Sequence, residues 1–266
     1  MDTVIHYYAY TSQGRNHANQ DICGFKDQSC WVLDGATPLF GDTHLGGNDV
    51  QKTMQKINAF LSKNYNSDLT PAENMYKACL SVSNEYRRNV KDYDDIPAYK
   101  LPTFAFALVS SHKEVMQYCI LGDCEIRTSS GIHIKDHRFD HINVMNQNND
   151  INIQKQMHIS DIHSLDEETY QKYYAQKLKA DQLQRSYLNT DTDNGYWIGS
   201  LDGKGFSHAF QGEVKLTKGE TVYLYCDGFA HLLEKHPALL EQLSDDAVNQ
   251  VRDETSDDVT VISFQA

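Results

Sequence analysis

Several familiar catalytic signatures are absent from this sequence of 266 residues. It has no G-x-x-x-x-G-K-[ST] phosphate loop, no G-x-G-x-x-G dinucleotide motif and no G-x-S-x-G nucleophile elbow. His137 and His141 have the i,i+4 spacing of zinc proteases, but the glutamate of that motif is missing. A pair of surface histidines is therefore the better interpretation, and we expect the chemistry to rest on carboxylates.

Basic charge and long apolar runs are also scarce. The sequence has 24 Lys and Arg against 37 Asp and Glu, which gives a net charge of −13. Nucleic acids and anionic membranes attract clustered Lys and Arg, so we expect neither as a partner. No apolar stretch is long enough to span a membrane, and the residues from Met1 to Val4 do not begin a signal peptide.

Cysteine pairs of the C-x-x-C type are missing, although the sequence contains six cysteines. Cys30, Cys119 and Cys226 lie in strand-like runs, where cysteine acts as a small apolar residue. This usage indicates reduced thiols, so we expect an intracellular, cytoplasmic protein.

The residues that are present predict one domain over residues 1–266, without internal repeats or a dividing linker. Apolar residues make up 40% of the chain, which is enough for a substantial core. Short turns join most of the expected strands, which favours antiparallel sheets. The expected strands are Val4–Tyr10, Ile22–Phe25, Cys30–Leu33, Thr103–Val109, Val115–Leu121, Ile126–Thr128, Tyr196–Ile198, the hairpin of Ala209–Leu216 with Thr221–Cys226, and Val259–Phe264.

Helical periodicity predicts two helices side by side on a sheet. One begins near Gly47 or Asn48, and its apolar stripe is Val50, Met54, Ile57 and Leu61. The other begins with a Thr70–Glu73 capping box. Its expected buried face is Ala72, Met75, Tyr76, Cys79, Leu80 and Tyr86.

The second half of the chain predicts a lobe over residues 136–195 that lies over the edge of a sheet. Its Asn- and Gln-rich part, Asn143–Asn152, is expected to be a loop. A capping box at Ser164–Glu167 predicts a helix to about Tyr187. The expected apolar side of that helix is Tyr170, Tyr174, Leu178 and Leu183, and two further helices are expected at Phe229–Glu234 and Ala238–Asp253.

A carboxylate at the end of a strand recurs along the chain. Asp34-Gly35 and Asp227-Gly228 each follow an apolar run, Gly122-Asp123 follows another, and Asp257-Asp258 precedes the last one. A single Asp-Gly pair after a strand is usually only a turn. Hard divalent cations prefer oxygen ligands, so the repetition predicts a metal site.

In this order, and together with Arg15, Asn19-Gln20-Asp21, Thr103 and Val259-Thr260, these motifs resemble the metal-dependent protein phosphatases of type 2C. The resemblance is to the compact bacterial form and runs from about Gly14 to the final strand. Each motif is weak alone, but their order and spacing are specific. The resemblance implies an α+β fold, a four-layer α-β-β-α sandwich of two antiparallel sheets flanked by helices.

The resemblance also implies a role for each matching residue. Asp34 would bridge two Mn²⁺ or Mg²⁺ ions, with Asp227 and Asp257 on the first ion. The Gly35 carbonyl would help to hold the second ion, and Asp21 would act from the same side, directly or through water. Asp123 would bind a third, weaker ion, and Arg15 would bind the phosphate.

The implied reaction is hydrolysis of phosphoserine or phosphothreonine in a phosphorylated protein, by attack of a hydroxide that bridges the metals. A cognate Ser/Thr kinase is then a possible partner, and the 136–195 lobe corresponds to a flap beside the cleft. Two alternatives stay open. The chain could be a catalytically weak or silent module that binds a regulatory partner, or it could use the same chemistry on a small-molecule phosphate.

The sequence departs from the family pattern at three places. Gln20 stands where many members have a glutamate, and Asp258 stands where an asparagine is common. Ala36-Thr37-Pro38 replaces the segment that carries the general-acid histidine of eukaryotic members. Protonation of the leaving group would fall to a metal-bound water or another group, for which His44 is a weak candidate.

Overall fold

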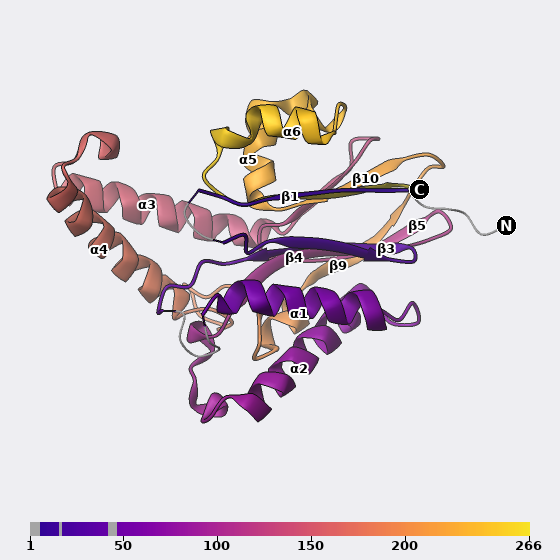
Figure 1. The fold of residues 1–266 in the computed structure, drawn as a ribbon, viewed down its shortest axis with the longest axis horizontal. Helices are drawn as coiled ribbons and strands as arrows, with labels where there is room; N and C mark the ends of the chain where they lie inside the picture. Colours follow the sequence, from indigo (N-terminus) through magenta and orange to yellow (C-terminus); the bar gives the residue numbers. More distant parts are fainter. Residues whose placement is uncertain (1–5, 16–17, 42–46) are drawn as a thin grey trace.

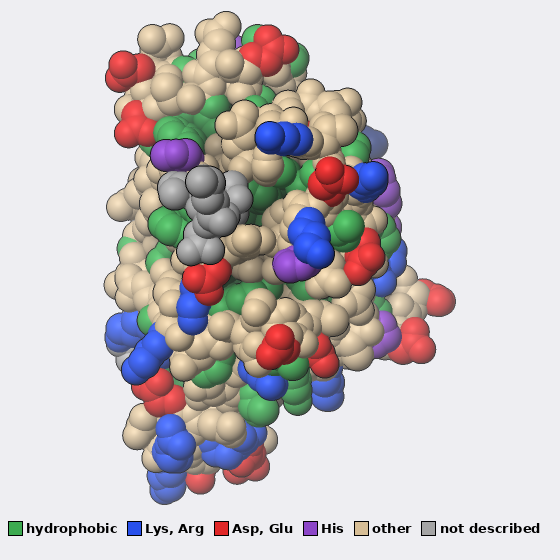
Figure 2. Space-filling model, turned by 90° about the vertical axis from the view of Figure 1, so that its right-hand side faces the viewer, with side chains coloured by type: hydrophobic (Ala, Val, Ile, Leu, Met, Phe, Trp, Pro, Cys, Tyr) green, Lys and Arg blue, Asp and Glu red, His purple; other side chains and the backbone are tan. Residues whose placement is uncertain are grey.

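The computed structural model describes residues 6–15, 18–41 and 47–266, and it has the predicted α+β architecture. Two antiparallel sheets pack face to face between two layers of helices (Figure 1). Figure 2 shows the end of the sandwich near the C-terminus, where acidic and basic side chains are interspersed. In the described part of the chain, no helix is both long and apolar enough to cross a membrane.

Each sheet contains strands from distant parts of the sequence. The first sheet has the order β1-β11-β10-β6-β7, and its strands are β1 Tyr7–Ser12, β11 Val259–Gln265, β10 Thr221–Tyr225, β6 Glu125–Thr128 and β7 His133–Lys135. The second has the order β2-β3-β4-β5-β9 with β8 beside β4, and its strands are β2 Ile22–Lys26, β3 Ser29–Gly35, β4 Thr103–His112, β5 Val115–Leu121, β9 Phe210–Lys215 and β8 Gly199–Ser200.

The predicted hairpin of Ala209–Leu216 with Thr221–Cys226 is wrong. β9 pairs with β5 in the second sheet, whereas β10 pairs with β11 and β6 in the first. The connection crosses between the sheets at Leu216, which is buried. Glu220 shapes the turn by accepting a hydrogen bond from the Thr217 amide at 2.8 Å. A tight turn between two strands therefore does not establish that the strands pair.

Helices α1 (Asp49–Asn64) and α2 (Pro71–Asn89) cover the outer face of the second sheet (Figure 1). The apolar stripe of α1 is buried, and the Thr70–Glu73 capping box forms, as predicted. The prediction of the buried face of α2 was partly wrong, because Tyr76 and Leu80 are 43% and 41% exposed. Ala78 and Val82 are buried on α2 instead, so the face that meets the sheet is rotated from the expected one.

Helices α5 (Asp227–Lys235) and α6 (Asp245–Val251) cover the first sheet (Figure 1). The single helix predicted over Ala238–Asp253 is broken in the structure. Ser244 ends the preceding segment and caps α6 by accepting a hydrogen bond from the Ala247 amide. Short 3-10 turns occupy Tyr93–Asp95, Ala98–Lys100, His137–Phe139, Ile162–Ser164, Lys204–His208, Pro237–Leu240 and Arg252–Glu254.

Helices α3 (Asp140–Gln156) and α4 (Glu167–Arg185) form a pair that projects from one end of the sandwich (Figure 1). The loop predicted at Asn143–Asn152 is therefore wrong. Asn and Gln are poor evidence against a helix when a few apolar residues anchor it, and here Ile142 and Ile153 are buried. The side chain of Tyr173 on α4 bonds Asp150 on α3 and links the two helices.

The beginning and the buried side of α4 also differ from expectation. Asp166, rather than Ser164, is the N-cap, and its carboxylate accepts a hydrogen bond from the Thr169 amide at 2.8 Å. Tyr170, Tyr174 and Leu183 are exposed and Leu178 is half-buried, whereas Tyr173 and Gln184 are the buried residues of this helix. A helix that contacts only one other helix buries a narrower stripe than a helix laid on a sheet.

The core has two parts that share the second sheet. One part lies between the two sheets and the other lies between the second sheet and helices α1 and α2. Trp31 on β3 belongs to the second part, is fully buried, and donates from Nε1 to Asn58 Oδ1 at 2.8 Å. This packing holds β3 rigidly just before its last residues, Asp34 and Gly35.

We predict that Trp31→Ala lowers the free energy of unfolding by about 3–5 kcal/mol, since it removes a fully buried ring and leaves a cavity. Urea denaturation followed by circular dichroism measures this change. Tyr174→Ala, at a 49% exposed position, is the control and should change stability by less than about 0.5 kcal/mol. Equal effects of the two variants would contradict the assignment of Trp31 to the core.

Candidate metal centre

One end of the sandwich collects the aspartates that the sequence singles out. In the second sheet, Asp21 directly precedes β2, Asp34 lies at the end of β3, and Asp123 follows β5. In the first sheet, Asp227 directly follows the Cys226 that ends the β10 segment, and Asp257 lies shortly before β11. Neighbouring strands run in opposite directions, so these five chain positions all fall at the same end of the two sheets.

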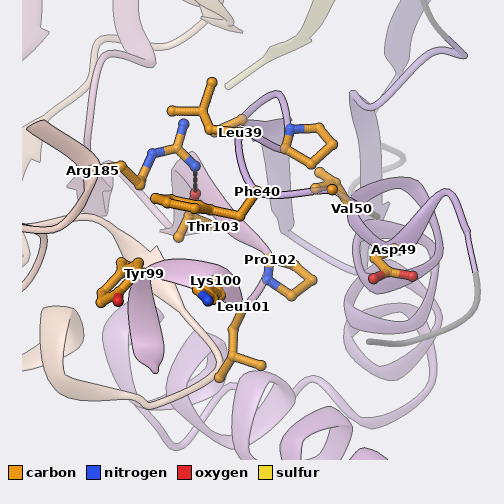
Figure 3. A pocket seen from close by; sticks show the side chains of 13 residues that line it. Leu39, Phe40, Asp49, Val50, Tyr99, Lys100, Leu101, Pro102, Thr103 and Arg185 are labelled. Atoms are coloured by element: carbon orange, nitrogen blue, oxygen red, sulfur yellow. Dashed lines mark hydrogen bonds between the residues drawn. The ribbon is translucent and has the colours of Figure 1, made fainter. Parts of the chain in front are cut away.

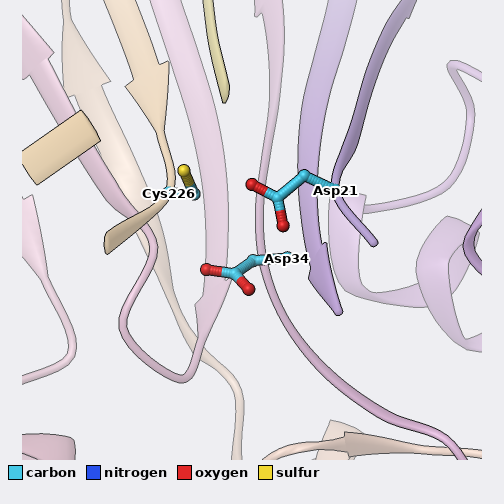
Figure 4. Close-up of side chains that lie close together, drawn as sticks. All are labelled: Asp21, Asp34 and Cys226. Carbon is cyan, nitrogen blue, oxygen red and sulfur yellow. The ribbon is translucent and has the colours of Figure 1, made fainter. Parts of the chain in front are cut away.

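The carboxylates face one another closely enough to affect their charges. Ligand atoms of Asp21, Asp34 and Cys226 all lie within 4.8 Å of one another (Figure 4). Burial raises the pKa of Asp34 well above its usual range, and the charges of Asp21 and Asp227 raise it further. The pKa of Asp227 is also raised, first by burial and then by the charges of Asp123 and Asp257. All five aspartates thus act electrostatically on one region.

Two members of the set have pKa values near neutrality. Burial raises the pKa of Asp21 to about 7, and the charges of Asp258 and Asp257 add to this effect. Burial likewise raises the pKa of Asp123 to about 6, with contributions from Asp257 and Glu125. Like charges held together in a site of low polarity disfavour ionisation, and a divalent cation among them reverses that effect. The same carboxylates and burial raise the pKa of the Cys226 thiol, which is therefore protonated in the metal-free protein.

Two buried oxygen atoms in this region have no hydrogen-bond partner. They are Asp21 Oδ2 and Gln20 Oε1, on side chains that are only 8% and 6% exposed. A buried polar atom without a partner is costly unless another ligand satisfies it. Together, the five carboxylates and the Gln20 amide oxygen are a donor set suited to hard divalent cations such as Mn²⁺ or Mg²⁺. The residues present therefore fit the ions that the resemblance implies.

Gly35 is required by close packing next to this centre. A Cβ at this position would lie 2.5 Å from Val50 Cγ1 and 2.7 Å from the Gln20 carbonyl oxygen. Only glycine allows the end of β3 to approach the segment that carries Gln20 and Asp21 so closely. The backbone of Ala36 is then fixed by a hydrogen bond from its amide to the Thr103 carbonyl at 3.0 Å.

Asp258 has a structural role in the loop that precedes β2. Its two carboxylate oxygens accept hydrogen bonds from the Gly14 amide at 2.6 Å and the Gln20 amide at 2.7 Å. Asp257 in turn accepts a hydrogen bond from the Asp258 amide at 2.9 Å. The two adjacent aspartates therefore differ in role, because Asp258 anchors the chain that positions Asp21 while Asp257 is exposed.

Arg15 lies close to the segment that contains Asp257, but its guanidinium group is not among the aspartates. Its amide donates to the Ser256 carbonyl at 3.0 Å, and its guanidinium group bonds the Asp253 carbonyl. The side chain is exposed. Phosphate binding by Arg15 stays a prediction. His44 lies outside the described residues.

Sequence reasoning missed Arg185, in the last turn of α4. Its Nη1 atom donates to Thr103 Oγ1 at 2.9 Å, and its Nη2 atom lies 3.4 Å from the Thr37 carbonyl oxygen (Figure 3). Gln182, three residues before Arg185, donates from Nε2 to the Leu39 carbonyl at 2.6 Å. Two hydrogen bonds thus connect the end of α4 to the loop that follows Asp34 and Gly35.

Tyr196 extends this connection toward Asp123. Burial raises the pKa of the Tyr196 hydroxyl, and both the Arg185 guanidinium group and the Asp123 carboxylate act on it. Tyr196 is 6% exposed and packs edge-on against Phe139 at the base of the projecting helices. No motif marked Arg185 or Tyr196, because their importance depends on which loop the end of α4 meets in three dimensions.

Comparison with known proteins identifies the fold. The serine/threonine phosphatase Stp1 from Staphylococcus aureus matches with a TM-score of 0.60 at 12% identity, over 100% of this chain and 96% of that one. PppA from Pseudomonas aeruginosa matches with a TM-score of 0.58 at 13% identity, over 99% and 98% of the two chains. The chain has the fold of Stp1 and PppA.

A third match is the catalytic domain of the serine/threonine protein phosphatase PstP, which was solved with two manganese ions. The TM-score is 0.57 at 11% identity, and 98% of this chain and 97% of that domain are covered. No protein-family model matches the sequence, and a search of curated proteins finds no relative. The similarity in structure confirms the four-layer fold that the type 2C resemblance implied.

We predict that the metal-free protein loses stability as the pH rises between about 4 and 7. The pKa of Asp21 is about 7 in the folded state against 3.8 in an ordinary setting, so the folded state binds more protons than the unfolded chain in this window. Urea denaturation of chelator-treated protein measures the free energy of unfolding at several pH values. Asp21→Asn should reduce the pH dependence, and saturating Mn²⁺ should do the same in the wild-type protein.

An exposed aspartate gives the control for this measurement. Asp193→Asn removes the same charge at an exposed loop position outside the set of five aspartates and should leave the slope unchanged. If the metal-free wild-type protein is instead more stable at pH 7 than at pH 5, the result contradicts a raised pKa of Asp21 in the folded state.

Proposed function

We propose that this protein is a phosphatase that requires Mn²⁺ or Mg²⁺ and hydrolyses phosphoserine and phosphothreonine in proteins. The observation that carries the proposal is the convergence of five aspartates at one end of a serine/threonine phosphatase fold. The two buried oxygens that lack a hydrogen-bond partner support the presence of cations in the functional protein. A phosphorylated protein is then the substrate and a Ser/Thr kinase is a candidate partner.

The proposed ligands follow from the positions of the carboxylates. The charges of Asp21, from beside β2, and Asp227, from the start of α5, both act on Asp34, which suits Asp34 as the shared ligand. Asp257 and the Gly35 carbonyl complete the proposed set for two ions, and Asp123 offers a further, separate ligand. Bound divalent cations would supply a water of lowered pKa as the nucleophile and neutralise charge on the phosphoryl group.

The chain's own residues would bind and orient the substrate around that centre. Arg15 is exposed beside the centre and carries a planar set of donors that suits phosphoryl oxygens. Arg185 and Gln182 would hold the loop after Gly35 and keep the end of β3 in place. Arg185 would thus act through position, because its donors bond Thr103 and Thr37 rather than the carboxylates.

Asp34→Asn tests the proposed function against a silent binding module. The change removes one negative charge and weakens the central ligand, so we predict a loss of turnover by orders of magnitude, or several kcal/mol in the barrier. Metal-free stability should not fall, since the variant relieves repulsion among the carboxylates. Hydrolysis of phosphopeptides with Mn²⁺ and the melting temperature of the metal-free protein measure the two effects.

Asp193→Asn is again the matched control and should retain wild-type turnover. Near wild-type turnover in Asp34→Asn would contradict the assignment of Asp34. If the wild-type protein hydrolyses neither phosphopeptides nor a small phosphate ester with either metal, the silent module becomes the better interpretation. Hydrolysis of the small ester alone would favour a small-molecule phosphate as the substrate.

Arg185→Ala should lower kcat/KM on phosphopeptides by about 10- to 100-fold, because a displacement of about 1 Å at the reacting groups is enough for such a loss. Arg185→Lys keeps the charge but loses the two donors of the guanidinium group, and its kcat/KM should lie between those of the wild-type protein and Arg185→Ala. Arg88→Ala is the control, since it removes an exposed arginine from the end of α2. Wild-type kcat/KM in Arg185→Ala, with α4 intact by circular dichroism, would rule out the positioning role.

A further inference from the structure

The sulfur of Cys226 lies within the proposed metal centre, although the phosphatase chemistry has no use for it. Its Sγ atom and carboxylate oxygens of Asp21 and Asp34 all lie within 4.8 Å of one another (Figure 4). Cys226 is fully buried and directly precedes Asp227. Among the described residues, this is the one group of three acidic, thiol or imidazole side chains whose atoms are close enough to share one ion.

Two independent observations, one atom without a hydrogen-bond partner and one hydrogen bond to sulfur, indicate that this group is arranged for a ligand. Asp21 Oδ2 has no hydrogen-bond partner, and its side chain is more than nine-tenths buried. The Thr260 amide donates to Cys226 Sγ at 3.1 Å. A backbone amide directed at sulfur stabilises the negative charge of a thiolate and is the kind of outer contact that supports a metal ligand. Both features lie on the side of the centre formed by Asp21 and Cys226.

We propose that Asp21, Asp34 and Cys226 form a site for a thiophilic divalent cation, Zn²⁺ or Cd²⁺, bound by two carboxylate oxygens and one sulfur. As the metal–sulfur bond forms, the thiol proton leaves to solvent, and no electrons are exchanged. Ligands lie about 2.0–2.3 Å from Zn²⁺ in tetrahedral geometry, so two of them are about 3.3–3.8 Å apart. Atoms that lie within 4.8 Å of one another therefore need to move together by roughly 1 Å, which side-chain rotation allows.

This site discriminates between classes of cation. Thiolate ligands favour Zn²⁺ and other soft or borderline ions, whereas Mn²⁺ and Mg²⁺ favour carboxylate, carbonyl and water oxygens. Asp34 is needed by both arrangements, so the thiophilic ion and the catalytic ions compete for it. The consequence is inhibition by Zn²⁺ of the metal-dependent hydrolysis, and this consequence, unlike the binding itself, rests on the function proposed above.

The binding test uses Cd²⁺ alone, because a cadmium–thiolate bond gives an ultraviolet charge-transfer band. We compare the metal-free, reduced forms of wild-type protein, Cys226→Ser and Cys79→Ser. Cys79 is the matched control, since it is equally buried and its thiol donates only to the Ser200 carbonyl at 3.1 Å. Wild-type protein and Cys79→Ser should show the band at one equivalent of Cd²⁺, and Cys226→Ser should not.

Loss of one ligand should weaken Cd²⁺ binding by about tenfold or more, at least as much as loss of an outer contact does. Asp21→Asn provides a second variant that leaves the thiol in place. It should still show the band, but its affinity for Cd²⁺ should fall in the same way. A band of equal intensity in wild-type protein and Cys226→Ser would overturn the proposal. So would wild-type protein that binds Cd²⁺ without any charge-transfer band.

The inhibition test compares each variant with its own uninhibited rate in Mn²⁺. Zn²⁺ should inhibit wild-type protein and Cys79→Ser at about tenfold or more lower concentration than Cys226→Ser. Equal sensitivity would show that Zn²⁺ binds through carboxylates alone, which contradicts the sulfur ligand. If no variant hydrolyses a phosphate ester, the proposed phosphatase function fails, while the charge-transfer measurement still decides whether Cys226 binds the cation.

Discussion

Mutual repulsion among neighbouring carboxylates, which range from the buried Asp21 to the exposed Asp257, is the constraint on which the rest of this structure depends. Five aspartates act on one region at the open end of the sandwich, and burial with like charges raises the pKa of Asp34 and Asp227 well above the usual range. A protein arranged only for stability would not keep these groups together. The arrangement becomes favourable when cations lie among the carboxylates, so stability and cation binding are linked by the same side chains.

The fold opposes this repulsion with rigid supports on each side of the centre. Trp31 fixes β3 in the core behind Asp34, and Gly35 lets β3 approach the Gln20 segment without a steric clash. Asp258 holds the loop before β2 through the Gly14 and Gln20 amides. Three kinds of interaction, apolar packing, close backbone contact and charge-assisted hydrogen bonds, thus position aspartates that come from both sheets.

The strand-end positions of the aspartates were predicted better than the elements around them. Asp34-Gly35 and the other motifs occupy strand ends, where local turn chemistry and chain order carry the information. Pairing of β9 with β5 could not be inferred locally, because a short turn such as that at Thr217–Glu220 can also connect two sheets. The helix over Asn143–Asn152 was missed because its stability comes from contact with α4 rather than from its own weak periodicity.

The contacts of Arg185 show why a residue without a motif can matter to a site. The projecting helices α3 and α4 bury only Ile142, Ile153, Tyr173 and Gln184 along their length. They are attached at the base, where Gln182 and Arg185 bond the loop after Gly35 and the charges of Arg185 and Asp123 both act on the Tyr196 hydroxyl. The end of α4 is therefore bonded directly to the loop beside Asp34. The projecting helices and the aspartates at the strand ends are consequently joined through one short segment, from Gly35 to Leu39.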